Sequence, residues 1–244
     1  MFLQYLRAYG SMIAATAYYG GRAFARYVVL GKPRMASGDE VTSQWSSLCM
    51  RGARVRVVVR NRERLETGSG KVLVSNHRSW FDIFALSVLL KRRFGFVGKQ
   101  ELSRVPLLGT VWQRVGHIAI DRSNRAAAIA SMERSVAILR DGWTIVLFPE
   151  GTRSRDGQVA RFKKGAVVMA INSQVPLLPV SICGSGRVMR KGDWRVRQGE
   201  IRIAIGEPIS TEGLTVGSRH ELAERCRSEV VRLLEEERGR ECPR

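Results

Sequence analysis

Residues 71–82 read KVLVSNHRSWFD, in which an apolar run ends in a polar loop that leads into a second apolar stretch. The first run has the length and composition of a buried strand, and the stretch that begins at Ser79 has the pattern of a helix. Strands and helices of this kind alternate along the chain, which predicts an α/β fold with a mostly parallel, mixed sheet flanked by helices. Strands are expected at 54–60, 71–75, 94–98, 117–120, 143–148, 177–183 and 201–205, and helices at 79–91, 106–115, 124–140, 163–172 and 219–237.

His77 and Asp82 form the first candidate pair of site residues. Inside one straight helix, residues five apart lie about 140° apart around the axis and about 7.5 Å along it, too far for a hydrogen bond. We therefore expect His77 on the loop before the helix, folded back over its first turn. Asp82 also has a structural explanation, because with Ser79 it resembles a capping box. The capping role does not exclude a catalytic one. A carboxylate in the first turn of the helix can also hold the Nδ1–H of His77, which leaves Nε2 free to accept a proton.

Two further polar motifs follow predicted strands, GHIAIDR at 116–122 and FPEGTRS at 148–154. Ligands of α/β proteins gather at the carboxyl ends of parallel strands. Arginine binds phosphate through paired donors, so we expect Arg153 to contact a phosphate group. A salt bridge with a neighbouring acid explains Arg122 almost equally well. Lys99, which follows another predicted strand, is a further candidate for the same basic pocket.

Other chemical signatures are missing from the sequence. There is no GxSxG nucleophile motif and no P-loop of the Walker type. His117 lies in an apolar run and is expected to be a core residue. The four cysteines are scattered, so no zinc spacing and no metal site are predicted, and the cysteines are expected to be thiols. The sequence thus indicates a general base and a basic pocket without a covalent nucleophile.

The formal net charge of the chain is +19. Residues 218–244 contribute none of this excess, because seven arginines there match seven glutamates. A surface this basic attracts phosphate, either of an anionic membrane or of nucleic acid. Aromatic residues make up only 7% of the chain and gather near its N-terminus, and no nucleic-acid-binding module is recognisable. We therefore expect an anionic membrane surface as a partner and no nucleic acid.

Residues 1–52 are predicted to form an N-terminal helical segment at the membrane interface, and residues 53–244 the α/β domain. The longest internal run without charge, 8–21, has 14 residues, fewer than the about 20 that a spanning helix needs. One alternative is that this helix packs on the rest of the protein. A minor alternative is a cleaved signal peptide, because Ala15-Thr16-Ala17 resembles a cleavage site. The apolar residues expected to enter the interface are Phe2, Leu3, Leu6, Met12, Ile13, Tyr18, Tyr19, Phe24 and Tyr27.

Four motifs in order, NHRSWFD, GHIAIDR, FPEGTRS and VPLLPVSI, resemble the four sequence blocks of the 1-acylglycerol-3-phosphate acyltransferases. The resemblance covers about residues 72–182. It implies a glycerolipid acyltransferase-like fold and the transfer of a fatty acyl group from acyl-CoA or acyl carrier protein to the hydroxyl of a lysophospholipid. The acceptor implied first is 1-acylglycerol 3-phosphate, which gives phosphatidic acid. No cofactor is implied besides the acyl thioester.

The resemblance also implies roles for individual residues. His77 would deprotonate the acceptor hydroxyl while Asp82 holds the histidine, and no acyl-enzyme would form. The glycerol phosphate would be held by Glu150, Gly151, Thr152 and Arg153, with Arg122 and Lys99 assisting. A lipid substrate implies a location at the inner membrane, peripheral or monotopic on the cytoplasmic face. Other acceptors are possible alternatives, namely glycerol 3-phosphate, a lyso-ornithine lipid or another lysophospholipid. An alternative from another class is a basic, non-catalytic protein that binds membranes or nucleic acid.

Overall fold

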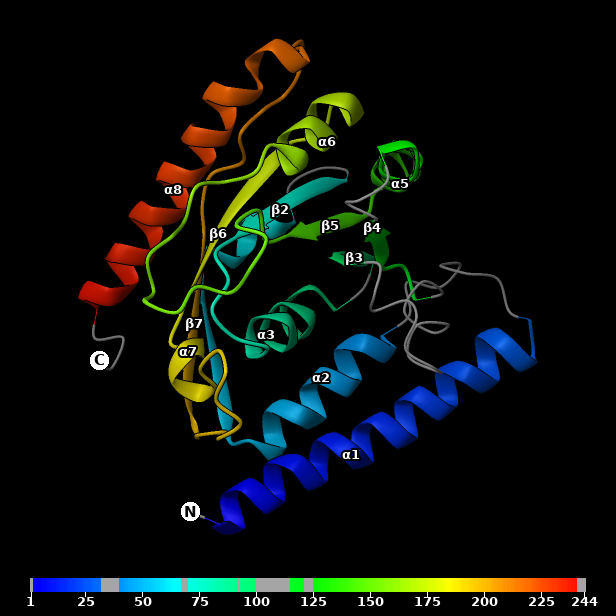
Figure 1. Cartoon of the computed structure of the whole chain (residues 1–244), viewed down its shortest axis with the longest axis vertical. Coiled ribbons are helices and arrows are strands. Elements are labelled where there is room, and N and C mark those ends of the chain that lie inside the picture. The colour runs from blue at the N-terminus through cyan, green and yellow to red at the C-terminus, as the bar shows by residue number, and fades with distance from the viewer. Residues whose placement is uncertain are drawn as a thin grey trace.

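The computed structural model describes residues 2–31, 40–66, 70–91, 93–99, 115–120 and 125–240. Within them a seven-stranded sheet has the order β1-β7-β6-β2-β5-β3-β4 (Figure 1). All strand pairs are parallel except β6 with β7, which confirms the mostly parallel, mixed sheet. The strands are β1 (Val55–Arg60), β2 (Lys71–Ser75), β3 (Phe94–Lys99), β4 (Ile118–Ile120), β5 (Thr144–Leu147), β6 (Leu177–Cys183) and β7 (Gly199–Ile205).

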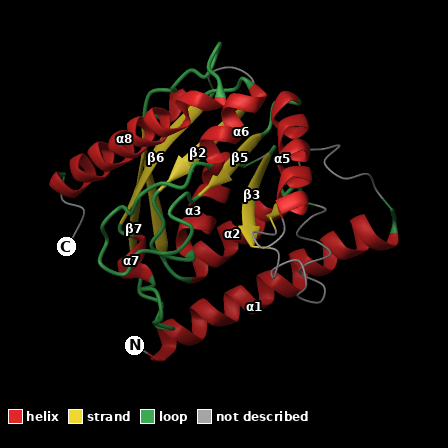
Figure 2. Cartoon of the chain, turned by 45° about the horizontal axis from the view of Figure 1, so that its top comes forward, coloured by secondary structure: helices red, strands yellow, loops and turns green. Residues whose placement is uncertain are grey.

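Helices cover both faces of this sheet. Every residue of β2 and β6 is buried, as expected for parallel strands packed on two sides. Alternate side chains of β2 point to opposite faces of the sheet. Leu73 packs in the core shared with α3, and Val72 and Val74 pack in the core shared with α6 and α8. Figure 2 shows α5, α6 and α8 on one face and α2 and α3 on the other. The bounds are α3 (Phe81–Leu90), α5 (Arg125–Arg140), α6 (Gly165–Ser173), α7 (Ser185–Val188) and α8 (Arg219–Gly239).

The N-terminal residues form α1 (Phe2–Phe24), a π-helical turn (Ala25–Val29) and α2 (Val41–Gly52). α1 lies alongside α2 at one edge of the molecule (Figure 1), and α2 packs on α3 through an edge-to-face contact of Trp45 with Phe84. The inward side of α1 carries small residues, among them the fully buried Ala8 and Ala15. Within the part of the chain that the structure describes, no helix is long and apolar enough to cross a bilayer. The division into 1–52 and 53–244 stays a prediction.

The apolar residues of α1 divide between solvent and protein. Leu3, Leu6, Ile13 and Tyr18 are exposed, as expected for residues that could enter a membrane interface. The prediction was wrong for Tyr27, which is buried, and for Met12 and Tyr19, which pack against the protein core. α1 has apolar residues both on the side that faces α2 and on the side that faces solvent. Hydropathy alone cannot tell which of these residues face the protein.

The predicted elements within the described residues are confirmed with small shifts of their ends. The short helix α7 and the 3₁₀ helices Arg62–Leu65 and Val216–Ser218 were not predicted, and β7 begins at Gly199 rather than at residue 201. The helix expected at 106–115 lies almost entirely outside the described residues. The stripe on α8 that was predicted to pack is buried, since Leu222, Cys226, Val230 and Leu233 all face the core.

The cysteines and His117 complete the core. Cys49 and Cys226 are buried thiols, and burial raises the pKa of each to about 12. Cys183 is disulfide-bonded, which corrects the expectation of four thiols; sequence spacing does not reveal which cysteines meet in space. His117 is a core residue as predicted, since its side chain is buried and its Nδ1 accepts the N–H of Phe96 at 3.1 Å. Burial lowers its pKa to about 3.

Candidate active site

His77 lies on the loop between β2 and α3, at the carboxyl end of a central strand. The loop is held by Asn76, whose buried side chain pairs with the backbone of Ile182 on β6. Asn76 donates from Nδ2 to the carbonyl oxygen at 2.9 Å and accepts the N–H at 2.8 Å. This two-way bond to a neighbouring strand fixes where the loop leaves the sheet. The expectation that His77 lies outside the helix is confirmed, since α3 begins at Phe81.

Asp82 gathers three hydrogen bonds on a single oxygen. Its Oδ2 lies 2.8 Å from Nδ1 of His77 and accepts the backbone N–H groups of Arg78 at 2.7 Å and Ser79 at 2.8 Å. The bond to Ser79 is half of the predicted capping box. The other half differs, because Ser79 Oγ accepts the N–H of Phe81 at 3.2 Å, one residue earlier than in a capping box. Asp82 thus has both of the roles that its spacing suggested.

The imidazole of His77 is held in a defined orientation. The fully buried carboxylate of Asp82 favours the tautomer with hydrogen on Nδ1, which leaves Nε2 as an acceptor. The ring also stacks on Phe148, with centroids 4.0 Å apart and planes at 15°. Its side chain remains 15% exposed, so a substrate can reach one edge of the ring. A positioned and accessible imidazole is the arrangement that a general base requires.

Glu150 joins the histidine loop to the loop after β5. Its Oε1 accepts the backbone N–H of His77 at 2.8 Å, and its Oε2 accepts the N–H of Ala160 at 3.0 Å. The side chain is buried, and burial raises the pKa of Glu150 while the two N–H bonds act in the opposite direction. A third bond, from the N–H of Ser154 to the carbonyl of His77 at 2.8 Å, connects the same loops. The carboxylate therefore positions the backbone of the histidine.

Residues 151–153 form a turn that presents its side chains next to the histidine loop. Gly151 has φ 78°, in the left-handed region that favours glycine. The guanidinium carbon of Arg153 lies 5.2 Å from the ring centre of Trp80 on the histidine loop. This cation–π contact places Arg153, Trp80 and His77 on adjoining loops. The sequence prediction of one site built from these two motifs is thus consistent with the geometry.

Lys191 is a residue of this site that the sequence did not indicate. Its Nζ donates to Thr152 Oγ1 at 2.9 Å and to the carbonyl oxygen of Arg153 at 2.7 Å. Lys191 follows α7, 38 residues beyond Arg153, in a stretch dense in arginine that offers no local signal for one lysine. The ammonium group adds a positive charge beside Arg153 and holds the turn in place.

Two residues predicted to belong to the basic pocket are not placed by the structure. Arg122 lies outside the described residues, and Lys99 ends β3 with a side chain that is not described. Their assisting roles stay predictions. Among the described residues, no three His, Cys, Asp or Glu side chains gather as they would around a metal ion. The described site therefore consists of a histidine–carboxylate pair and a basic turn.

A family model described as Acyltransferase matches residues 56–183, more than half of the chain. The chain belongs to the acyltransferase family. The matched span runs from β1 to the end of β6 and includes both the histidine loop and the turn with Arg153. The resemblance inferred from the four motifs is confirmed at the level of the family.

Individual members of the acyltransferase family are similar over much of the chain. The 1-acyl-sn-glycerol-3-phosphate acyltransferase of Limnanthes douglasii is 41% identical over 146 residues, 59% of this chain and 52% of the plant protein. The human 1-acyl-sn-glycerol-3-phosphate acyltransferase alpha is 31% identical over 183 residues, 75% of this chain and 65% of the human protein. The chain thus spans about half the length of the plant relative.

A solved structure of the family shares the fold. The crystal structure of the 1-acyl-sn-glycerophosphate (LPA) acyltransferase PlsC from Thermotoga maritima has a TM-score of 0.73 and 26% identity. The similarity covers 97% of this chain and 95% of that protein. The predicted acyltransferase-like α/β fold is therefore confirmed.

Proposed function

We propose that the protein transfers a fatty acyl group from an acyl thioester, on coenzyme A or acyl carrier protein, to the free hydroxyl of 1-acylglycerol 3-phosphate. The product would be phosphatidic acid. The observation that carries the proposal is the 2.8 Å contact of His77 Nδ1 with the buried Asp82, which leaves Nε2 free beside the basic turn of Arg153. The printed names of the similar family members support the same acceptor.

The chemistry needs one proton acceptor. Nε2 of His77 takes the proton of the acceptor hydroxyl as its oxygen attacks the thioester carbonyl, and Asp82 stabilises the imidazolium that forms. The C–O bond forms, the tetrahedral intermediate collapses and the C–S bond breaks. The thiolate leaves readily because a thiol has a pKa of about 8.5, and it then regains the proton from His77. The free thiols Cys49 and Cys226 are buried with raised pKa values, which disfavours either as an acylated nucleophile.

The acceptor phosphate is proposed to bind Arg153. A guanidinium that lies against Trp80 is held in one orientation and can offer paired donors to phosphate oxygens. The exposed Thr152 lies on the same turn and Lys191 contacts it from the segment after α7, so the two can add a hydroxyl and a charge. Glu150 is proposed to contribute by positioning the turn and His77, with Arg122 and Lys99 as assisting cations.

Replacing Arg153 with alanine should raise the KM for 1-acylglycerol 3-phosphate by about tenfold or more, because a charge-assisted bond to phosphate contributes about 1.5–3 kcal/mol. The KM for the acyl donor should stay nearly unchanged. Arg155→Ala is the matched control, since Arg155 is an exposed arginine on the same loop. Steady-state rates at varied acceptor and fixed donor measure the effect. An unchanged acceptor KM in Arg153→Ala would instead favour an acceptor without a phosphate monoester, which a panel of lysolipids would then identify.

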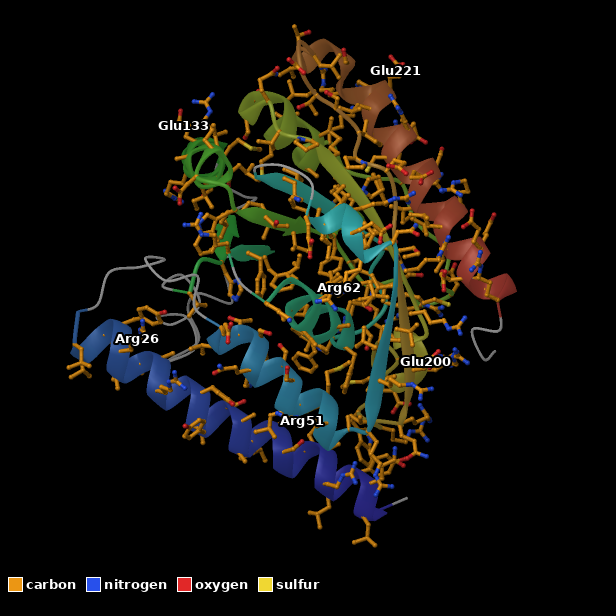
Figure 3. All side chains as sticks on the ribbon, turned by 180° about the vertical axis from the view of Figure 1, so that it is seen from behind. Arg26, Arg51, Arg62, Glu133, Glu200 and Glu221 are labelled. Atoms are coloured by element: carbon orange, nitrogen blue, oxygen red, sulfur yellow. The ribbon has the colours of Figure 1, made fainter. Side chains whose placement is uncertain are left out.

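We also propose that α1 lies in the interface of the inner membrane on its cytoplasmic face, as a peripheral or monotopic anchor. Leu3 and Leu6, one turn apart, are 78% and 60% exposed. Arg7 and Arg22 on the same helix are exposed as well, and Figure 3 labels Arg51 in the last turn of α2, which packs on α1. Exposed apolar residues with neighbouring arginines suit the boundary between acyl chains and anionic headgroups.

The double variant Leu3→Glu/Leu6→Glu should bind anionic liposomes at least about tenfold more weakly, because each exposed leucine that enters the membrane contributes about 1.5–3 kcal/mol. Val216→Glu is the control, since Val216 is also exposed but belongs to the turn that leads into α8, at the far end of the molecule from α1 (Figure 1). Cosedimentation at fixed lipid and salt concentration measures binding. Equal binding of the double variant and the control would contradict an interface role for α1.

A further inference from the structure

Arg78 follows His77 directly, but the chemistry described so far does not use its side chain. The guanidinium lies in a slot between two glycines. A Cβ added at Gly157 would lie 2.6 Å from Cζ of Arg78, and one added at Gly186 would lie 3.1 Å from Nε. The Nε atom is buried, and no hydrogen-bond partner for it exists among the described residues. Burial of an unpaired guanidinium nitrogen is unfavourable unless an anion compensates for it.

Two further arginines adjoin Arg78. Arg238 on α8 donates from Nη2 to the carbonyl oxygen of Gly157 at 2.7 Å, so two guanidinium groups contact the same glycine. Arg190 lines a surface cavity together with Gly186, the glycine that packs against Nε of Arg78. Burial lowers the pKa of Arg78, and the charges of Arg238 and Arg190 act in the same direction. The positive charges therefore outnumber the acids that could balance them.

The nearby acids, Asp82 and Asp156, are already engaged in other bonds. Asp82 Oδ2 accepts three hydrogen bonds on the histidine loop. Asp156 Oδ1 accepts the hydroxyl of Ser154 at 2.9 Å and the N–H of Gln158 at 3.0 Å. Neither carboxylate forms an ion pair with Arg78 within the described residues. The arginine cluster formed by Arg78, Arg190 and Arg238 is thus left without an acid paired to Arg78.

One member of the arginine cluster, Arg190, lines two surface cavities. One has a volume of about 450 Å³ and is lined by Arg190, Lys191, Gly192, Asp193, Trp194 and Arg195. The other has a volume of about 340 Å³ and is lined by Gly186, Arg187, Arg190, Asp193, Arg195 and Arg197. Asp193, the one acid in either lining, accepts bonds from Arg195. Both volumes are within the range of small-ligand sites, and the linings favour a phosphorylated ligand.

We propose that Arg78, Arg190 and Arg238 bind the phosphate of the phosphopantetheine arm of the acyl donor. This inference rests on the proposed function, in which both substrates carry phosphate and Arg153 binds that of the acceptor. The arm is common to coenzyme A and acyl carrier protein, and it has the thioester at one end and the phosphate at the other. When the thioester lies at His77, the phosphate must lie away from Nε2 toward the surface, where Arg190 and Arg238 are exposed.

The kinetic test compares donors with and without the phosphate. We expect Arg190→Gln and Arg238→Gln each to raise the KM for acyl-CoA by about tenfold, because each removes one charge-assisted bond to phosphate. With S-acyl pantetheine, which lacks the phosphate, the variants should match the wild-type protein. Arg225→Gln is the control, because it removes the same charge from the same helix about 20 Å from Arg238. Equal losses with both donors, or a raised acceptor KM in place of the donor KM, would overturn the proposal.

A binding test separates this inference from the proposed function, because it requires no acyl transfer. Phosphopantetheine should raise the midpoint of thermal unfolding of the wild-type chain and of Arg225→Gln by a few degrees, and unphosphorylated pantetheine should not. The shift should be lost in Arg190→Gln and Arg238→Gln. The side chain of Arg190 has no hydrogen bond or ion pair with described residues, so its loss should leave folding intact. No shift in the wild-type chain, or the same shift in all four proteins, would disprove the site even if acyl transfer is observed.

Discussion

Replacing His77 with alanine is expected to reduce acyl transfer by about 10²- to 10⁴-fold, the range that general acid–base catalysis contributes in enzymes. The variant loses the only group that the described geometry offers to take the proton of the acceptor hydroxyl. Without a base, the attacking oxygen stays protonated, and kcat falls while substrate binding to the basic turn persists. Release of free thiol from acyl-CoA, measured in the presence and absence of acceptor, follows the reaction directly.

Two controls decide what a loss of activity in His77→Ala means. His220→Ala removes an exposed histidine that contacts Lys164 and should keep activity within about twofold of the wild-type protein. His77→Ala itself should bind anionic liposomes like the wild-type protein and keep its cooperative unfolding, although it loses the stacking contact with Phe148. If purified His77→Ala kept nearly full activity under these conditions, the general-base mechanism would be wrong.

The strands and the position of His77 could be predicted because they depend on local properties of the chain. The buried strands β2 and β6 are continuous apolar runs, and their lengths follow from where those runs end. The loop position of His77 follows from helix geometry, which forbids a contact with Asp82 inside one helix. The two site loops were expected near each other because both follow strands of a parallel sheet. The structure adds the strand order, in which β2 and β5 pair in parallel and end at the same edge.

The partners of the site residues depend on contacts across the fold and could not be predicted. Glu150 stands in a loop with glycine and arginine, a context that suggests a ligand-binding acid, yet both of its oxygens accept backbone N–H groups. Lys191 reaches Thr152 from the segment after α7, and Arg78 and Arg238 of the last helix contact the same glycine, Gly157. Apart from Ala160, ten residues from Glu150, each partner is tens of residues away, and no periodicity or spacing encodes such a meeting.

Asp82→Asn is expected to lower kcat by about a hundredfold or more while leaving both KM values nearly unchanged. The asparagine carbonyl can take the place of Oδ2 and still accept the N–H groups of Arg78 and Ser79, so the loop should keep its shape. The negative charge next to Nδ1 of His77 is lost, and the imidazolium that forms during proton transfer is no longer stabilised. The effect should therefore appear in the chemical step rather than in substrate binding.

Stability and a matched variant show whether the loss in Asp82→Asn comes from charge or from misfolding. The new amide nitrogen would lie where Oδ1 now lies, a buried atom without a hydrogen-bond partner among the described residues. The free energy of unfolding should fall by about 1–3 kcal/mol, the typical effect of one buried unpaired donor, and the protein should stay folded. Asp141→Asn, in an exposed turn before β5 and away from the carboxyl ends of the strands, should change neither kcat nor stability. The amide preserves the hydrogen bonds of the loop and removes only the charge that orients and stabilises His77. A folded Asp82→Asn protein with wild-type kcat would therefore show that the carboxylate only stabilises the start of the helix.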